Sequence, residues 1–103
     1  MSRIRVASFS DLEEGVGLRV DLTEHRVAIF LVDGQLFAIG DRCSHAEASL
    51  SEGEVFDREV ECPKHGSVFD LSSGEPRSLP ATTPVPVYQV STEGGDVYLE
   101  VEE

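Results

Sequence analysis

The sequence predicts an all-β domain built from short antiparallel strands. Apolar residues recur with a period of two, which is typical of strands, rather than the 3.6 of helices. One segment, 26–32, is dense in branched and aromatic residues, as strand interiors are. Turn-forming pairs such as Asp33-Gly34 divide the chain at short, regular intervals. Many short strands separated in this way indicate a sandwich or an open barrel.

The N-terminal half contains two early strands and one strong hairpin. We expect strands over 3–7 and 17–22, with one helical turn over 10–14 capped by Ser10 or Asp11. The strongest element is a hairpin of strands 26–32 and 36–39 around Asp33-Gly34, because glycine tolerates the positive φ that a tight turn requires.

The C-terminal half continues the pattern around a proline-rich stretch. Strands are expected over 54–56, 59–61, 68–71, 85–91 and 96–101. Asp57-Arg58 forms the turn of the first pair, and Glu93-Gly94-Gly95 the turn of the last. Between them, four prolines favour neither helix nor central strand: Pro76, Pro80, Pro84 and Pro86.

Length and composition predict one globular domain spanning residues 1–103. Hydrophobic residues make up 40% of the chain and charged residues 27%. No apolar run approaches the roughly 20 residues that span a bilayer. The segment after Met1 has no apolar signal core, so we expect a cytoplasmic protein that does not contact membranes.

The chain is strongly acidic, with 20 acidic and 8 basic residues and a formal net charge of -12. This charge argues against nucleic acid as a partner, because the phosphates would be repelled. Two interpretations remain open. The charge serves solubility alone, or it steers the chain toward a basic partner surface.

Two short pairs carry the chemistry: Cys43-Ser44-His45 and Cys62-Pro63-Lys64-His65, with sixteen residues between them. Each pair follows an expected strand, where a loop can turn ligands toward a shared point. In a reducing compartment a structural disulfide is not expected, so the cysteines are better interpreted as metal ligands. The third histidine, His25, has no ligand-type neighbour and is expected to face solvent near a strand start.

Two metal centres accept two cysteines and two histidines. Zinc binds such a set as a tetrahedron and would make the chain a zinc-stabilised binding module. Zinc ribbons and fingers generally pair cysteine with cysteine, however, whereas each loop here supplies one of each. A two-iron cluster explains this mixing better, because one iron takes both thiolates and the other both imidazoles.

The motif C-x-H, sixteen residues, then C-x-x-H followed by Gly66-Ser67 resembles the Rieske proteins. Further matches to Rieske-type ferredoxins are Glu47-Ala48, Leu50-Ser51-Glu52-Gly53, Phe69-Asp70 and Gly74-x-Pro76. The resemblance covers nearly the whole chain. It implies one [2Fe-2S] cluster, with Cys43 and Cys62 on the inner iron and His45 and His65 on the outer one. It also implies an antiparallel β base domain with an inserted cluster-binding subdomain at about 41–79.

The resemblance also bears on the reduction potential. Histidine ligation makes the oxidised cluster neutral and places Rieske centres at roughly -150 to +300 mV. High-potential respiratory members carry an extra disulfide, where this chain has Ala48 and Lys64. They also carry a tyrosine hydrogen-bonded to a ligand sulfur, where this chain has Phe69. Ser67 is retained and is expected to donate to a sulfide. With fewer hydrogen-bond donors to the cluster sulfurs, we expect a reduction potential near the low end of this range.

By the same resemblance the chain is a one-electron carrier and not itself an enzyme. It looks like the ferredoxin component of multicomponent aromatic-ring dioxygenases. There a flavin reductase oxidises NAD(P)H, and a terminal oxygenase receives the electrons. We expect a monomer that binds this reductase and oxygenase. The main alternative is the small Rieske subunit of an assimilatory nitrite reductase. The aromatic substrate leaves no trace in this chain.

Overall fold

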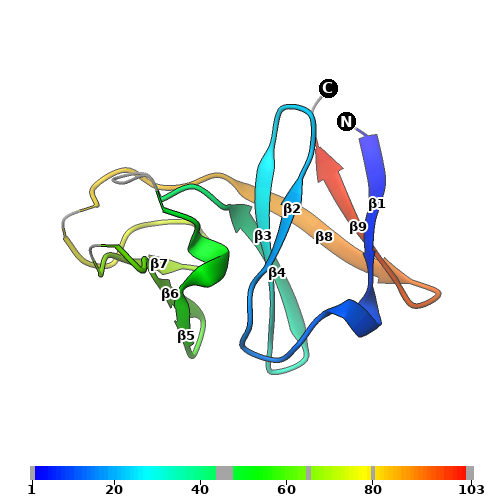
Figure 1. Cartoon of the computed structure of the whole chain (residues 1–103), viewed down its shortest axis with the longest axis horizontal. Helices are drawn as coiled ribbons and strands as arrows, with labels where there is room; N and C mark the ends of the chain where they lie inside the picture. The colour runs from blue at the N-terminus through cyan, green and yellow to red at the C-terminus, as the bar shows by residue number, and fades with distance from the viewer. Residues whose placement is uncertain (1, 44–47, 65, 80, 102–103) are drawn as a thin grey trace.

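The structure is a computed structural model, and it describes residues 2–43, 48–64, 66–79 and 81–101. Almost all regular structure is β, in two antiparallel sheets (Figure 1). The larger sheet has the order β1-β9-β8-β4-β3-β2, and the smaller β5-β6-β7. The predicted all-β fold is confirmed. The large-sheet strands are β1 Ser2–Ser8, β2 Leu18–Asp21, β3 Arg26–Val32, β4 Gln35–Gly40, β8 Val87–Glu93 and β9 Asp96–Val101; the small-sheet strands are β5 Glu54–Phe56, β6 Glu59–Glu61 and β7 Val68–Asp70.

Two tight hairpins hold the large sheet in register. Asp33 and Gly34 both have positive φ, 52° and 76°, between the paired residues Val32 and Gln35. Gly94 and Gly95, at 59° and 85°, do the same between β8 and β9. Two successive positive φ values give the turn a twist that matches the strands, which is why these residue pairs predicted the hairpins correctly.

Strand β3 is buried on both faces, which explains its unbroken apolar sequence. Alternate residues point to opposite faces of a strand. Val27 and Ile29 pack with the core of the large sheet. Ala28, Phe30 and Val32 pack instead with a second core, which contains residues of the small sheet. Strand β3 therefore joins the two cores.

The segment between β4 and β8 carries the small sheet and the 3-10 helix η2, Leu50–Glu52 (Figure 1). Val60 of β6 and Phe69 of β7 are fully buried against the core that β3 shares. The predicted subdomain limits, about 41–79, stay a prediction.

Several expected element ends differ from the structure by one to three residues, and two of the differences have a clear physical reason. The helical turn is a 3-10 helix, η1, over Phe9–Asp11. Asp11 closes it rather than beginning it, because its carboxylate accepts the Ser8 N–H at 3.0 Å. Strand β8 begins at Val87 and not at residue 85. Pro86 has no N–H, and its carbonyl instead accepts the Gly40 N–H at 2.8 Å.

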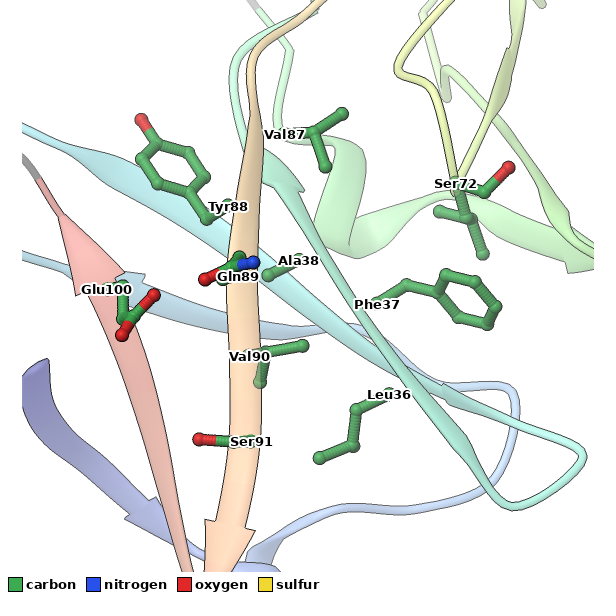
Figure 2. Close-up of a pocket in the computed structure, with 11 residues that line it drawn as sticks. Leu36, Phe37, Ala38, Ser72, Val87, Tyr88, Gln89, Val90, Ser91 and Glu100 are labelled. Atoms are coloured by element: carbon green, nitrogen blue, oxygen red, sulfur yellow. The ribbon is translucent and has the colours of Figure 1, made fainter.

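A cavity of about 490 Å³ opens where β4 and β8 diverge (Figure 2). Strand pairing between them covers only Ala38–Tyr88 and Ile39–Val87. None of the described residues lining this cavity belongs to either Cys-His loop. Within the described residues, no helix is both long and apolar enough to traverse a bilayer.

Candidate metal centre

Both cysteines are buried at the start of a loop that follows a strand. Cys43 lies just beyond β4 and is 3% exposed, and Cys62 directly follows β6 and is 1% exposed. They belong to the same hydrophobic core, together with Leu50, Val60 and Phe69. No disulfide joins these two cysteines, both of which the structure describes. The fold therefore brings both predicted thiolate ligands to one apolar region.

The two loops, 43–48 and 62–67, are closed in the same way. The Cys43 N–H donates to the Ala48 carbonyl at 3.0 Å, and the Cys62 N–H donates to the Ser67 carbonyl at 2.7 Å. In the second loop the Gly66 N–H also donates to the Cys62 carbonyl at 3.0 Å. Gly66 has a φ of 77°, where a glycine is strongly favoured. Each cysteine is thus fixed by the backbone of its own loop.

The histidine ligands predicted from the motif, His45 and His65, lie outside the described residues. The remaining histidine, His25, directly precedes β3, near a strand start as expected, and is partly buried. Its Nδ1 lies 3.1 Å from the Tyr88 hydroxyl, and the two rings meet edge to face. Tyr88 lies far away in the sequence, so the pattern around His25 carried no sign of this contact.

Ser67 is fully buried and ties a third segment to the second loop. Its hydroxyl oxygen accepts the N–H of Ala81, itself 3% exposed, at 3.0 Å. A serine hydroxyl also has one hydrogen to donate. The contact with Ala81 therefore leaves Ser67 able to donate to an acceptor in the buried region between the loops.

Asp41, which no motif in the sequence marks, connects the first loop to the large sheet. Its side chain is fully buried. The Ser49 hydroxyl donates to Oδ2, and the Ser51 N–H donates to Oδ1 at 2.9 Å. The Asp41 carbonyl also accepts the Leu50 N–H. Asp41 thus binds the chain on the far side of the loop that Cys43 begins.

The carboxylate of Asp41 is charged although it is buried. Burial raises its pKa, but the hydrogen bonds from Ser49 and Ser51 and the nearby Arg19 outweigh burial and leave the pKa below its ordinary value. Arg26 Nη2 lies 3.5 Å from Oδ2, and Arg19 Nε lies 3.8 Å from the same oxygen. Asp41 therefore links the first loop to β2 and β3.

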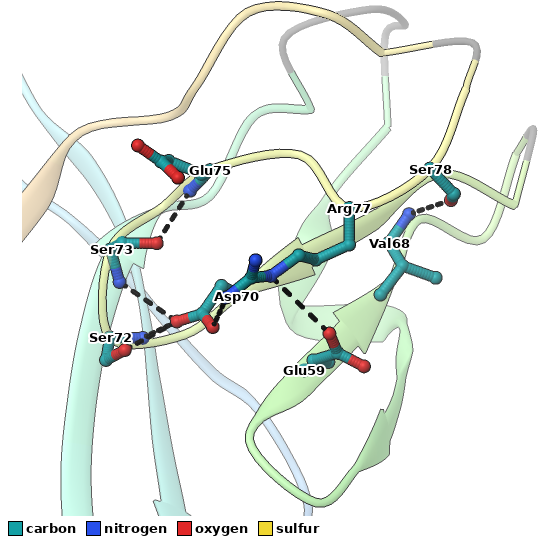
Figure 3. A network of polar contacts seen from close by, with 8 residues as sticks. All are labelled: Glu59, Val68, Asp70, Ser72, Ser73, Glu75, Arg77 and Ser78. Atoms are coloured by element: carbon teal, nitrogen blue, oxygen red, sulfur yellow. Dashed lines mark hydrogen bonds and ion pairs between the residues drawn. The ribbon is translucent and has the colours of Figure 1, made fainter.

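A second carboxylate, Asp70, orders the turn that follows β7 (Figure 3). Its Oδ1 accepts from the Ser72 N–H, the Ser72 hydroxyl and the Ser73 N–H, at 2.8, 2.5 and 3.1 Å. Arg77 Nη2 donates to Oδ2 at 2.7 Å. The hydrogen bonds from Ser72 and then Arg77 hold the pKa of Asp70 far below its usual range. This network fixes the path of the chain toward Ala81.

The described donors fit an iron–sulfur cluster. Thiolates are soft ligands that suit such clusters, and a hydrophobic surrounding limits the access of water. Here two thiols share one apolar core, and the buried Ser67 hydroxyl lies on the loop of the second. Backbone hydrogen bonds fix the described ends of both loops, Cys43 to Ala48 and Cys62 to Ser67.

Comparison with known proteins decides the family. Residues 2–89 match the family described as "Rieske [2Fe-2S] domain". The chain belongs to this Rieske family. Its cofactor is a Rieske-type [2Fe-2S] cluster rather than zinc, and its role is electron transfer.

Three similar proteins match this chain over nearly the whole of their own length. The 3-phenylpropionate/cinnamic acid dioxygenase ferredoxin subunit of Escherichia coli K12 is 45% identical over 100% of this chain and 97% of its own. The ferredoxin of carbazole 1,9a-dioxygenase from Nocardioides aromaticivorans IC177 is 33% identical, with a TM-score of 0.92 over 99% and 100% of the two chains. A chain in a complex of reduced oxygenase and oxidised ferredoxin of carbazole 1,9a-dioxygenase is 35% identical, with a TM-score of 0.88 over 97% of each chain.

The nitrite reductase alternative shares this fold at lower sequence identity. A structure described as a putative NADH-dependent nitrite reductase small subunit, from Mycobacterium tuberculosis, is 27% identical with a TM-score of 0.86, over 99% of this chain and 97% of that one. Fold alone therefore does not separate the two functions, whereas sequence identity favours the dioxygenase ferredoxins.

Proposed function

We propose that this chain is the ferredoxin of a multicomponent aromatic-ring dioxygenase. It accepts single electrons from an NAD(P)H-dependent flavin reductase and passes them to a terminal oxygenase. One observation carries the proposal: the 45% identity to a dioxygenase ferredoxin subunit extends over all of this chain and 97% of that subunit. The similar chain in a complex of oxygenase and ferredoxin supports the same assignment of the acceptor.

The ligand set proposed is Cys43 and Cys62 on the inner iron and His45 and His65 on the outer iron. Burial of both cysteines in one core supports the first half of this assignment. The histidines are assigned from the motif alone. When bound, the cluster supplies reversible one-electron redox chemistry.

The chain's own residues position the ligands and determine the environment of the proposed cluster. The Cys43 and Cys62 backbone hydrogen bonds orient the thiolates, and Asp41 holds the first loop against the sheet. Ser67 is proposed to donate to a sulfide of the cluster. Phe69 is fully buried in the same core and offers no donor, which supports a potential near the low end of the Rieske range.

The chain is proposed to work as a cytoplasmic monomer with a cluster-binding subdomain at about 41–79. It contacts no aromatic substrate and supplies no residue to oxygen chemistry. Substrate choice then belongs entirely to the oxygenase.

Reconstitution tests the function. Purified chain is combined with NADH, the flavin reductase and the terminal oxygenase of its own source organism, and hydroxylated product is measured. Product formation that saturates with the chain and is lost in Cys62→Ser is expected. Stable co-purification with a sirohaem protein, with no support of the oxygenase, would instead favour the nitrite reductase subunit.

A further inference from the structure

Half of the chain's basic residues line one groove beside the two Cys-His loops. Arg19, Arg26, Arg42 and Lys64 surround a cavity of about 520 Å³, in a chain with 8 basic residues and a net charge of -12. Among its described lining residues, Glu52 is the one that carries a negative charge. We call this the basic groove.

The fold collects these side chains from four separate places. Arg19 lies on β2, and Arg26 begins the neighbouring strand β3, where its direct partner is Asp21. Arg42 directly precedes Cys43, and Lys64 lies in the second loop. Ala48 and Ser49, at the far end of the first loop, also line the groove, as does Pro63 of the second. The basic groove therefore borders both loops.

The groove continues along the large sheet. Arg19, Arg26 and Arg42 also line a second cavity, again of about 520 Å³, that extends past His25 and Tyr88 and includes the acidic residues Asp21 and Glu24. The positive side chains thus lie at the centre of an extended depression, where a convex partner surface has room to settle.

Two of the arginines, Arg19 and Arg26, lie next to the buried carboxylate of Asp41. Asp41 lies 3.5 Å from Arg26 and 3.8 Å from Arg19, while the two arginine side chains stay 42% and 43% exposed. Arg19 also pairs with Asp21, its Nε lying 2.9 Å from Oδ1. A guanidinium has five N–H donors, so these contacts leave donors for a further acceptor. Holding a side chain in place reduces the entropy lost when a partner binds. The contacts with Asp21 and Asp41 therefore limit the positions of these arginines while leaving both side chains exposed to an external acceptor.

We propose that the basic groove is the docking site for a carboxylate-rich face of a protein that exchanges electrons with this chain. The proposal rests on the proposed function, since it names the partner chemistry for that same electron transfer. Charge complementarity supports it: the groove gathers cations, whereas the rest of the surface is predominantly acidic. An acidic face would be repelled elsewhere on the chain and attracted beside the loops, which selects the productive orientation.

This proposal differs from steering by net charge, which favours a basic partner surface. Added salt slows transfer in both cases, so salt alone does not distinguish them. Neutralising an arginine or lysine of the basic groove does distinguish the two kinds of docking. It weakens docking to an acidic face, but it makes the chain more negative and so favours docking to a basic face.

The test uses Arg19→Gln, Lys64→Gln and their combination, with Arg3→Gln as the matched control. Arg3 on β1 is 42% exposed and lies 3.7 Å from Glu93, so it resembles Arg19 in exposure and in having an acidic partner. Stopped-flow gives the second-order rate constants for electron transfer from the purified reductase and to the purified oxygenase. The EPR spectrum and midpoint potential of each variant report whether the metal centre is intact.

With spectrum and potential unchanged, each groove variant is expected to lower the rate constant with one of the partners about 2- to 5-fold, and the double variant more. Arg3→Gln is expected to match the wild type. Groove variants that behave like Arg3→Gln, or that transfer electrons faster, overturn the proposal and leave the proposed function standing. A wild-type chain that exchanges electrons with neither protein overturns the proposed function and the docking site with it.

Discussion

Replacing Asp41 with asparagine tests how the first loop is held. The substitution keeps the shape of the side chain but removes its charge and turns one acceptor into a donor. The Ser49 hydroxyl, the Ser51 N–H and two arginines all depend on this carboxylate. The amide oxygen can still accept the Ser51 N–H, and the amide NH2 can donate to the Ser49 hydroxyl, which lies 2.8 Å from the Ser51 hydroxyl as an alternative acceptor. Both hydrogen bonds persist, but neither has a charged acceptor any longer.

A hydrogen bond to a charged group contributes about 1.5–3 kcal/mol, and a neutral one about 0.5–1.5 kcal/mol. The two arginine contacts are long and half-exposed, so they add little. Replacing two charged hydrogen bonds with neutral ones therefore predicts that the free energy of unfolding falls by about 2–3 kcal/mol, which lowers the melting temperature of a domain of this size by about 10–25 °C.

The assay is thermal unfolding of the cluster-loaded protein, followed by far-ultraviolet circular dichroism and visible absorbance at a fixed scan rate. Asp21→Asn is the control, because Asp21 binds the same Arg19 at 2.9 Å but is 58% exposed. That variant is expected to change stability by less than about 1 kcal/mol. The reasoning is refuted if Asp41→Asn melts together with Asp21→Asn and the wild type.

Three further predictions concern the second loop and its neighbours. Phe69→Tyr should raise the midpoint potential, because a new donor stabilises the more negative reduced state; spectroelectrochemistry showing an unchanged or lower value would contradict this. Ser67→Ala should lower the potential and destabilise the fold by about 1–3 kcal/mol, since the Ala81 N–H loses its acceptor. A potential equal to that of the wild type would mean that Ser67 does not donate to the cluster. Asp70, whose pKa is lowered on folding, contributes stability that is complete above its unfolded pKa of about 3.9 and is lost as the pH falls below it. Asp70→Asn should therefore be less stable than the wild type at neutral pH, and the difference should shrink in acid; parallel stability curves between pH 2 and 7 would exclude this role.

Local signals predicted most of the fold. The Asp33-Gly34 and Gly94-Gly95 turns were predictable because their backbone requires positive φ at two successive residues. The apolar run of β3 was predictable because both of its faces are buried. The errors lie at element ends, where a single hydrogen bond decides the outcome, whether local or long-range. The Ser8–Asp11 hydrogen bond places η1, and the Gly40–Pro86 hydrogen bond sets where β8 begins.

The ligand motif was equally local, because each Cys-His pair spans only a few residues. Asp41 and the basic groove were not predictable in the same way. Asp41 acts through Ser51 and through arginines on other strands, so nothing in its own neighbourhood marks it. Arg19 and Lys64 are far apart in the sequence and share a cavity only because the small sheet packs beside β2 and β3. Residues that act by long-range packing leave no short-range pattern.

The most direct test of the electron-transfer role is the EPR spectrum of dithionite-reduced protein, with iron, sulfide and zinc assayed on the same sample. We predict two irons and two sulfides per chain and a rhombic signal with the low average g of histidine-ligated clusters, lost in Cys43→Ser and Cys62→Ser. Stoichiometric zinc with no signal in the reduced state would contradict the account.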